Sequence, residues 1–287
     1  MRKLILALLV ASITTYTQSQ SSIALNGSSD FVTAQDSRSL DISGDFTIEA
    51  WIKPNDITLE KTILIKGNGS QCGNYGLFIK DGNLAYVSEG ECGWNGRGPN
   101  SDLAVNVWQH VAVVGEGNTL KLYIDGVLTD DITLSAIHGN LNNDELWIGR
   151  SVFSTDNFFF DGKIDEVAIW NVALSAADVT ALYNSGNGLK ASADSGNYDN
   201  SSDLIGYWKF NEGTGSTLTD STSNSNNGTL TNMDSSDWVT SGFNLTGGIA
   251  IHKYDQLGWG ENPDNKNIGI IDHSLGATIA TLTSQAN

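Results

Sequence analysis

The chain has 287 residues, long enough for one large β-sandwich or two smaller domains. It carries 33 acidic against 15 basic residues, and this formal charge of −18 excludes nucleic acid and anionic membranes as partners, because no basic surface is available to neutralise phosphates. Gly is abundant, with 31 residues, whereas Pro occurs only 3 times. Asn, Ser, Thr and Asp fill the intervals between short apolar runs, a pattern typical of many short strands joined by turns.

The N-terminus has the pattern of a signal peptide over residues 1–19. Arg2 and Lys3 precede the apolar run 4–13, and small residues around Ser19 suit signal peptidase, so cleavage is predicted after Ser19. No later stretch approaches the roughly 18 apolar residues of a spanning helix. The mature protein is therefore expected to be secreted, in the extracellular space or at the cell surface, with no membrane span.

Cys72 and Cys92 are the two cysteines of the chain. In an exported protein an even count favours a disulfide, and the two strand-like runs between them indicate a bridge across the open end of a hairpin. A cysteine metal site is the alternative, but it lacks further Cys or a nearby His. We predict the Cys72–Cys92 disulfide.

Strand patterns dominate residues 23–170. In the segment 45–54, Phe46, Ile48, Ala50 and Ile52 alternate with polar residues, which predicts one buried face. Tight turns are expected at 81–82, 117–118 and 125–126, where Gly, Asp and Asn tolerate positive φ. Four tryptophans in strands are interpreted as core residues: Trp51, Trp108, Trp147 and Trp170.

One short helix is predicted after the strand 162–170. Ser175 is a good N-cap and Asp178 completes a capping box, while Leu174 can pack on Val179 as a hydrophobic staple. Gly186 is placed to end the helix in a left-handed conformation. Residues 189–203 are polar and read as a linker, strand and turn signals return over 204–243, and the pattern of 244–287 supports no assignment.

The order of several motifs resembles the laminin-G-like, concanavalin A-like jelly rolls, a superfamily that includes pentraxins, legume-type lectins and laminarin-type glucanases. The motifs are ALNGSSDFVTA, FTIEAWIKP, VWQHVAVV, LKLYIDGVL, LWIGR and FDGKIDEVAIWNVALSAADVTALYNSG. The resemblance implies an all-β fold, a two-sheet antiparallel jelly-roll sandwich with one short C-terminal helix, over residues 20–188.

The segment 204–230 is similar to the part that usually opens such a module, yet here it follows the helix. Two arrangements account for this: residues 204–243 fold back to complete the jelly roll, or they begin a second repeat. An exposed sheet edge favours fold-back.

Catalytic residues are not predicted. The resembling glucanases carry a Glu-x-Asp-x-Glu strand because retaining hydrolysis needs two carboxyls about 5 Å apart. That spacing is absent, and the adjacent Asp165 and Glu166 are expected on opposite faces of their strand. The four histidines form no HExxH pattern, and no GxSxG elbow or P-loop occurs. We expect a protein that is not an enzyme.

The resemblance implies a structural Ca²⁺ ion. In the resembling modules the final strand supplies an Asp, which corresponds to Asp165, and the loop after the first strand supplies further oxygens, which corresponds to Asn26, Gly27 and Asp30. Ca²⁺ takes 6–8 oxygen ligands. By alternation Asp165 shares the inward face of Val167 and Ile169, where an unpaired acid is costly. The alternative is an Asp at the rim that accepts backbone amides.

A Gly-rich loop is the candidate ligand-binding site. It carries Trp94, Asn95, Arg97 and Glu91, and Tyr75 near Cys72 is a weaker companion. A Trp there can stack on a pyranose ring while Asn and Arg bond hydroxyls; a Trp folded over the sandwich edge is the alternative. We expect a carbohydrate-binding or adhesion module that binds glycans or extracellular proteins. A structural adhesin or assembly module without a sugar site is the rival hypothesis, and a glycan-active enzyme comes third.

Overall fold

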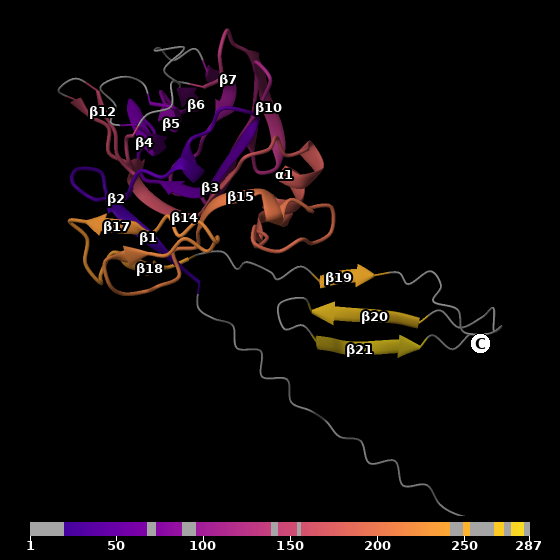
Figure 1. The fold of residues 1–287 in the computed structure, drawn as a ribbon. Coiled ribbons are helices and arrows are strands. Elements are labelled where there is room, and N and C mark those ends of the chain that lie inside the picture. The colour runs from indigo at the N-terminus through magenta and orange to yellow at the C-terminus, as the bar shows by residue number, and fades with distance from the viewer. Residues whose placement is uncertain are drawn as a thin grey trace, which may run out of the picture.

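The computed structural model of the protein describes residues 20–67, 73–87, 96–138, 143–153 and 156–241, and the backbone of three strands between 249 and 283. Residues 96, 97, 153 and 156 are described by their backbone alone. Two antiparallel sheets pack face to face with one short α-helix against them, as Figure 1 shows. This confirms the predicted all-β sandwich.

The first sheet, sheet A, has β14 at its centre. Its strand order is β10 (Val127–Thr133), β9 (Thr119–Ile124), β8 (Gln109–Glu116), β3 (Phe46–Pro54), β14 (Asp161–Trp170), β1 (Ser21–Asn26) and β18 (Trp238–Thr240). β15 (Leu204–Trp208) also pairs with β14. Since β3 occupies one edge of β14, β1 and β15 share the other, β1 along residues 161–164 and β15 along residues 167–170.

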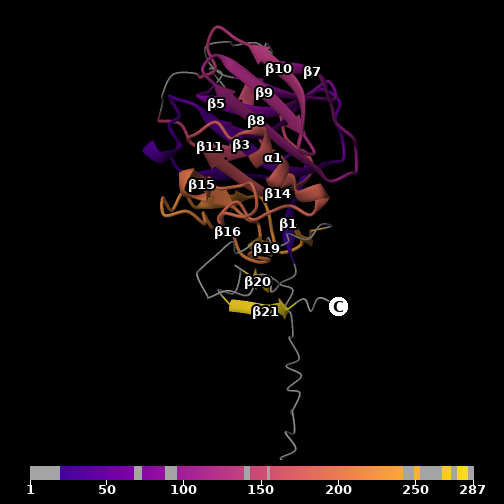
Figure 2. The same ribbon diagram turned by 90° about the vertical axis from the view of Figure 1, so that its right-hand side faces the viewer.

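The second sheet, sheet B, lies across the core from sheet A. Its order is β16 (Thr217–Leu218), β17 (Gly228–Thr231), β2 (Phe31–Ala34), β11 (Leu146–Ile148), β4 (Glu60–Lys66), β5 (Tyr75–Lys80), β6 (Asn83–Val87) and β7 (Gly96–Asp102). Two smaller sheets are separate from these: β12 (Val152–Phe153) with β13 (Asp156–Asn157), and β19 (Ile249–His252), β20 (Asn267–Asp272) and β21 (Ala277–Thr283). Figure 2 shows β20 and β21 beyond one end of the sandwich.

The core fills the space between the sheets. Phe46, Ile48, Ala50 and Ile52 all lie in it, which confirms the alternation expected for this strand. The opposite face of sheet A is also buried, because α1 (Ala176–Tyr183) and residues 189–207 cover it with a second apolar cluster. Sheet A is therefore buried on both faces over these strands.

The helix begins and caps as predicted. The Ser175 hydroxyl accepts the Asp178 N–H at 3.2 Å, and the Asp178 carboxylate accepts the Ser175 N–H at 2.9 Å. The predicted end was wrong by two residues, since Asn184 (φ 47°) is the left-handed C-cap and Gly186 follows in a 3-10 turn, η3 (Asn184–Gly186). An amide side chain can stabilise the left-handed conformation locally, which makes Asn an adequate substitute for Gly.

Residues 204–241 are part of the sandwich. β15 and β18 extend sheet A, whereas β16 and β17 extend sheet B, and Figure 1 shows this orange segment along the lower side of the sandwich. Its buried side chains join the central core: Ile205, Trp208, Phe210, Leu218, Leu230 and Trp238. Residues 189–203, which carry no strand pattern, pack on sheet A through Tyr198, whose hydroxyl accepts the indole N–H of Trp170 at 3.0 Å.

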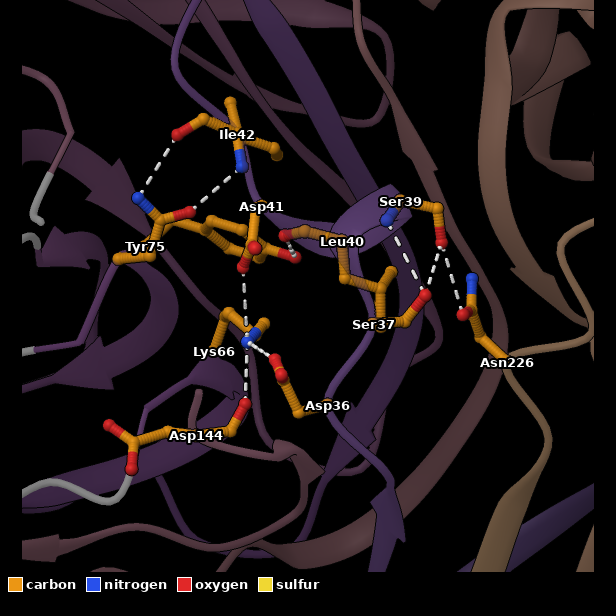
Figure 3. Close-up of polar contacts among 11 residues, drawn as sticks. Asp36, Ser37, Ser39, Leu40, Asp41, Ile42, Lys66, Tyr75, Asp144 and Asn226 are labelled. Carbon is orange, nitrogen blue, oxygen red and sulfur yellow. Dashed lines mark hydrogen bonds and ion pairs between the residues drawn. The ribbon is translucent and has the colours of Figure 1, made fainter. Parts of the chain in front are cut away.

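A buried ion-pair network anchors the crossing from β2 in sheet B to β3 in sheet A (Figure 3). The ammonium of Lys66, which is fully buried, lies 2.7 Å from Asp36 and 3.3 Å from Asp41, and donates to the Asp144 carbonyl at 2.5 Å. A buried ammonium is tolerated only with such partners. The Tyr75 hydroxyl donates to the Leu40 carbonyl at 3.0 Å in the same region, which includes η1 (Arg38–Leu40).

Candidate functional site

The predicted ligand-binding loop falls mostly outside the described residues. Glu91, Trp94 and Asn95 lie outside them, as do Cys72 and Cys92, and Arg97 is described only as a backbone position in β7. The loop connects β6 to β7, which are neighbours in sheet B. The ligand-binding role of this loop and the Cys72–Cys92 disulfide therefore stay predictions.

Tyr75 has a structural place instead. Its side chain is fully buried in the core, and burial raises the pKa of its hydroxyl well above the usual value. A ring in this position cannot stack on a sugar, because no part of it reaches solvent.

The structure does not bring Asp165 together with the loop of Asn26, Gly27 and Asp30. In the β1–β14 pairing Asn26 lies opposite Asp161, and Asp165 is four residues further along β14. Four residues of strand span about 13 Å. The ligand set expected from the resemblance is therefore divided between two places.

The loop 26–30 satisfies its own polar groups. The Asn26 side chain accepts the N–H groups of Ser28 and Ser29 at 2.9 Å, an Asx turn, and Asp30 accepts the Ser29 hydroxyl and the Asn26 N–H. Asp161 packs over Gly27, where an added Cβ would lie 2.8 Å from the Asp161 Cβ.

A β-bulge in β14 changes the face on which Asp165 lies. Asp165 pairs with Trp51 and Ala168 pairs with Glu49, so three steps along β14 match two along β3 and Glu166 (φ 49°) is the extra residue. Val167 and Ile169 remain in the core, whereas Asp165 shares the outer face of its partner Trp51.

Two strand-alternation predictions were therefore wrong: Asp165 does not face inward with Val167, and Glu166 does not point away from it. Both side chains lie on the outer side of sheet A, where Asp165 accepts the Glu166 N–H at 2.9 Å. The inserted residue breaks the period of two on which the predictions rested.

Asp165 lies near other buried oxygen atoms that have no hydrogen-bond partner among the described residues. It is fully buried, and its Oδ2 accepts no hydrogen bond, nor do the hydroxyls of Ser22 and Ser241 or Oε2 of Glu212 form one. Ile23 pairs with Ile164, so the next residue along each antiparallel strand brings Ser22 to Asp165. Ser241 is held at the start of β1, because its N–H donates to the Gln20 carbonyl at 2.7 Å.

Burial and neighbouring carboxylates both act on the pKa of Asp165. Burial raises the pKa of Asp165 well above its usual range, and the charges of Glu166 and Glu212 raise it further. The Ser241 hydroxyl lies near enough to lower that pKa without forming a hydrogen bond of normal geometry. Among the described residues no three His, Cys, Asp or Glu side chains gather in a metal-binding group, so a cation here would depend on hydroxyl and carbonyl oxygens as well.

Glu166 belongs to a second buried network that sequence reasoning missed. Its Oε1 accepts the Gln20 amide at 2.7 Å and its Oε2 accepts the Tyr207 hydroxyl. Burial raises the pKa of Glu166 to about 8, although the Tyr207 hydrogen bond and the charge of Lys209 lower it. Nearby, the Glu49 carboxyl and the His110 ring form a hydrogen bond of 2.9 Å, and burial raises the pKa of Glu49 too.

A cluster of aromatic side chains and one arginine lies on the outer face of sheet B. In β11, Leu146 and Ile148 point into the core, so Trp147 points away from it and is half-buried. The Arg150 guanidinium carbon lies 4.7 Å from the ring centre of Phe31, 5.1 Å from Trp147 and 5.2 Å from Phe159. The prediction that Trp147 is a core residue was wrong, because a strand of three apolar residues does not reveal which face is covered.

Comparison with known proteins identifies the family. The family model of the concanavalin A-like lectin/glucanases superfamily, Laminin_G_3, matches residues 26–180, more than half of the chain. The chain belongs to this superfamily. The resemblance derived from the strand motifs is thereby confirmed, and no curated protein matches the chain.

One solved structure shows the same fold at low identity, and two others are reported for comparison. A proposed carbohydrate-binding protein of Bacteroides ovatus is 19% identical with a TM-score of 0.61; the match covers 80% of this chain and 62% of that protein. A heptameric SAP-like pentraxin from Limulus polyphemus is 17% identical over 60% of this chain and 85% of its own, with a TM-score of 0.45. The CBM40 of the Ruminococcus gnavus IT-sialidase is 18% identical over 57% and 97%, also with a TM-score of 0.45.

Within the described part of the chain, no helix combines the length and the apolar character that crossing a membrane would require.

The pKa of Glu166 predicts a pH dependence of stability. A carboxyl whose pKa is raised on folding binds more protons in the folded state, so its contribution is complete below about pH 4.5 and is lost as the pH rises through about 8. Glu166→Gln, which mimics the neutral acid, should lessen the fall in unfolding free energy over this range by up to about 1.4 kcal/mol per pH unit.

Urea unfolding at several pH values, with chelator present, measures the effect. Glu116→Gln is the matched control, since Glu116 is exposed and pairs with Lys121 at the surface. Equal slopes for the wild type and Glu166→Gln would contradict the assignment.

Proposed function

We propose that this chain is a non-catalytic carbohydrate-binding module that acts outside the cell. Membership of the lectin/glucanase superfamily over residues 26–180 is the observation that carries the proposal. The partly exposed aromatic surface at Trp147 supports it, because aromatic rings beside polar groups are the usual platform for sugars. The carboxylates of Asp165 and Glu166 are buried at 0% and 2% exposure, which leaves them out of reach of a polysaccharide.

Adhesion between proteins is the second candidate, and exposed apolar side chains favour it. Leu59, Val105 and Val107 are 68%, 45% and 51% exposed. Their loops are joined through Gly82, which donates its N–H to the Ile57 carbonyl and accepts the Leu103 N–H at its own carbonyl. Apolar groups gathered in this way suit a protein surface better than a sugar.

The loop of Glu91, Trp94, Asn95 and Arg97 is proposed as a ligand contact. If Trp94 stacks on a sugar ring, Trp94→Ala should lower glycan affinity by about tenfold or more, because a stacked aromatic contributes about 1–3 kcal/mol. A glycan array followed by calorimetry on the retained glycan provides the measurement. Val127→Ala is the control, because it removes an exposed apolar side chain elsewhere on the surface. A core tryptophan such as Trp238 would be unsuitable, because its loss would disturb the fold.

Array binding that survives Trp94→Ala unchanged would remove the loop from the proposal. Absence of binding to any glycan, together with association through the exposed side chains of Leu59, Val105 and Val107, would favour the adhesin.

A structural Ca²⁺ ion at Asp165 is also proposed, with a different set of partners from that expected for the loop 26–30. Ca²⁺ prefers oxygen ligands and tolerates irregular geometry. Asp165, Ser22, Ser241 and Glu212 offer oxygens without hydrogen-bond partners, and burying an unpaired carboxylate is costly unless a cation or a proton neutralises it. The bound ion would supply that charge, while the chain's own residues hold the β14 bulge in place.

Calcium should therefore stabilise the protein. With an affinity of about 0.1 mM, typical of the tighter extracellular modules, about 1 mM calcium contributes roughly 1.4 kcal/mol and raises the Tm by about 2–5 °C. Differential scanning fluorimetry with calcium and with chelator measures the shift. Asp165→Asn should abolish it, whereas Asp30→Asn should leave it intact.

If Asp30→Asn abolishes the shift and Asp165→Asn does not, the ion binds in the loop 26–30 instead. Identical melting with calcium and chelator would exclude both sites.

A further inference from the structure

We propose that Trp147 and Arg150, on the outer face of sheet B, form a subsite for a sugar that carries a carboxylate, such as a uronic or sialic acid. The inference rests on the proposed carbohydrate-binding function and names the chemical class of the ligand. No residue of this subsite belongs to the loop at Trp94 or to the pocket at Asp165.

Arg150 is held rigidly before any ligand arrives. Three aromatic rings, those of Phe31, Trp147 and Phe159, lie within 5.2 Å of its guanidinium carbon, and one terminal nitrogen donates to the Asn157 side chain at 2.9 Å. Phe31 also packs on both neighbouring rings, with centroids 6.1 Å and 6.4 Å apart. An arginine fixed in this way loses little side-chain entropy when it binds an anion.

The guanidinium has hydrogen-bonding capacity left over. Of its five N–H donors the structure uses one, to Asn157, and the buried Nε–H has no acceptor among the described residues. No described carboxylate forms an ion pair with Arg150, although the chain carries 33 acidic residues. The terminal N–H groups that do not bond Asn157 are therefore left for the oxygens of a ligand.

Trp147 is oriented by neighbours that leave its ring partly exposed. Its indole N–H donates to Glu145 at 3.0 Å, and the other oxygen of Glu145 accepts the Gln35 amide at 2.6 Å. These bonds engage both oxygens of Glu145, and no ion pair joins this carboxylate to Arg150 among the described residues. The ring is available to the C–H face of a pyranose while Arg150 meets its charged substituent.

The chemistry of the pair selects an acidic sugar over a neutral one. A guanidinium matches a carboxylate through two parallel N–H···O bonds, and charge-assisted bonds are roughly twice as strong as neutral ones. A neutral sugar would offer hydroxyls to the same donors and gain no charge pairing. The subsite therefore favours the carboxylate form of a sugar over its uncharged analogue.

Matched pairs of probes test the inference by isothermal titration calorimetry. One pair is trigalacturonic acid and its carboxyl-reduced trisaccharide; the other is sialyllactose and lactose. At least one acidic probe should bind about tenfold more tightly than its neutral counterpart. Arg150→Gln should reduce that preference below about threefold, and Arg150→Lys should keep only part of it, because a lysine keeps the charge but loses the planar fork.

Arg38→Gln is the matched control, because Arg38 is exposed and its substitution removes the same charge without altering the aromatic rings. Equal affinity for acidic and neutral probes, or a preference that survives Arg150→Gln, would overturn the subsite while the glycan-binding proposal stands. A preference lost equally in Arg38→Gln would also overturn it, by assigning the effect to overall charge. Binding to no glycan on an array would overturn the proposed function and the subsite with it. A melting curve of each variant verifies folding, and Arg150→Lys carries the test if Arg150→Gln does not fold.

Discussion

The shared edge of β14 is the constraint on which the rest of the sandwich depends. β3 occupies one edge of this strand, and the other is divided between β1, from the start of the described chain, and β15, which lies about 180 residues later. The bulge at Glu166 falls where one partner ends and the other begins. Because the inserted residue moves Asp165 and Glu166 to the outer side of sheet A, the buried carboxylates, the unpartnered hydroxyls and the proposed ion all follow from this junction.

The outer faces of the two sheets differ in how far they are covered. Sheet A is covered by α1 and residues 189–207, so its polar groups act in stability, as the networks of Glu166 and Glu49 show. Sheet B keeps an aromatic surface in which Trp147 is half-buried and Arg150 is framed by rings. Other side chains on the same face of sheet B are buried, among them Ile65 and Phe78, so a glycan can approach this face only where Trp147 and Arg150 remain partly exposed.

Local signals in the sequence predicted local structure well. The capping box of Ser175 and Asp178 and the alternation over 45–54 depend on residues that are close in the chain, and both are present. The face of Asp165 could not be predicted, because the bulge is set by strands that pair with β14 from distant parts of the chain. Trp147 raised the same difficulty: in the run Leu-Trp-Ile every residue is apolar, and only the packing of sheet A against sheet B decides which side is covered.

Cleavage between the two parts of the chain that meet at β14 tests the central claim most directly. Gly196 and Asn197 are exposed, so a protease site inserted there can be cut in the folded protein. If residues 204–241 complete the sandwich, the two fragments will elute together on size-exclusion chromatography and separate only in denaturant, because β15, β17 and β18 hold the later fragment in both sheets. Fragments that separate under native conditions, with the earlier one still folded and monomeric, would contradict the account.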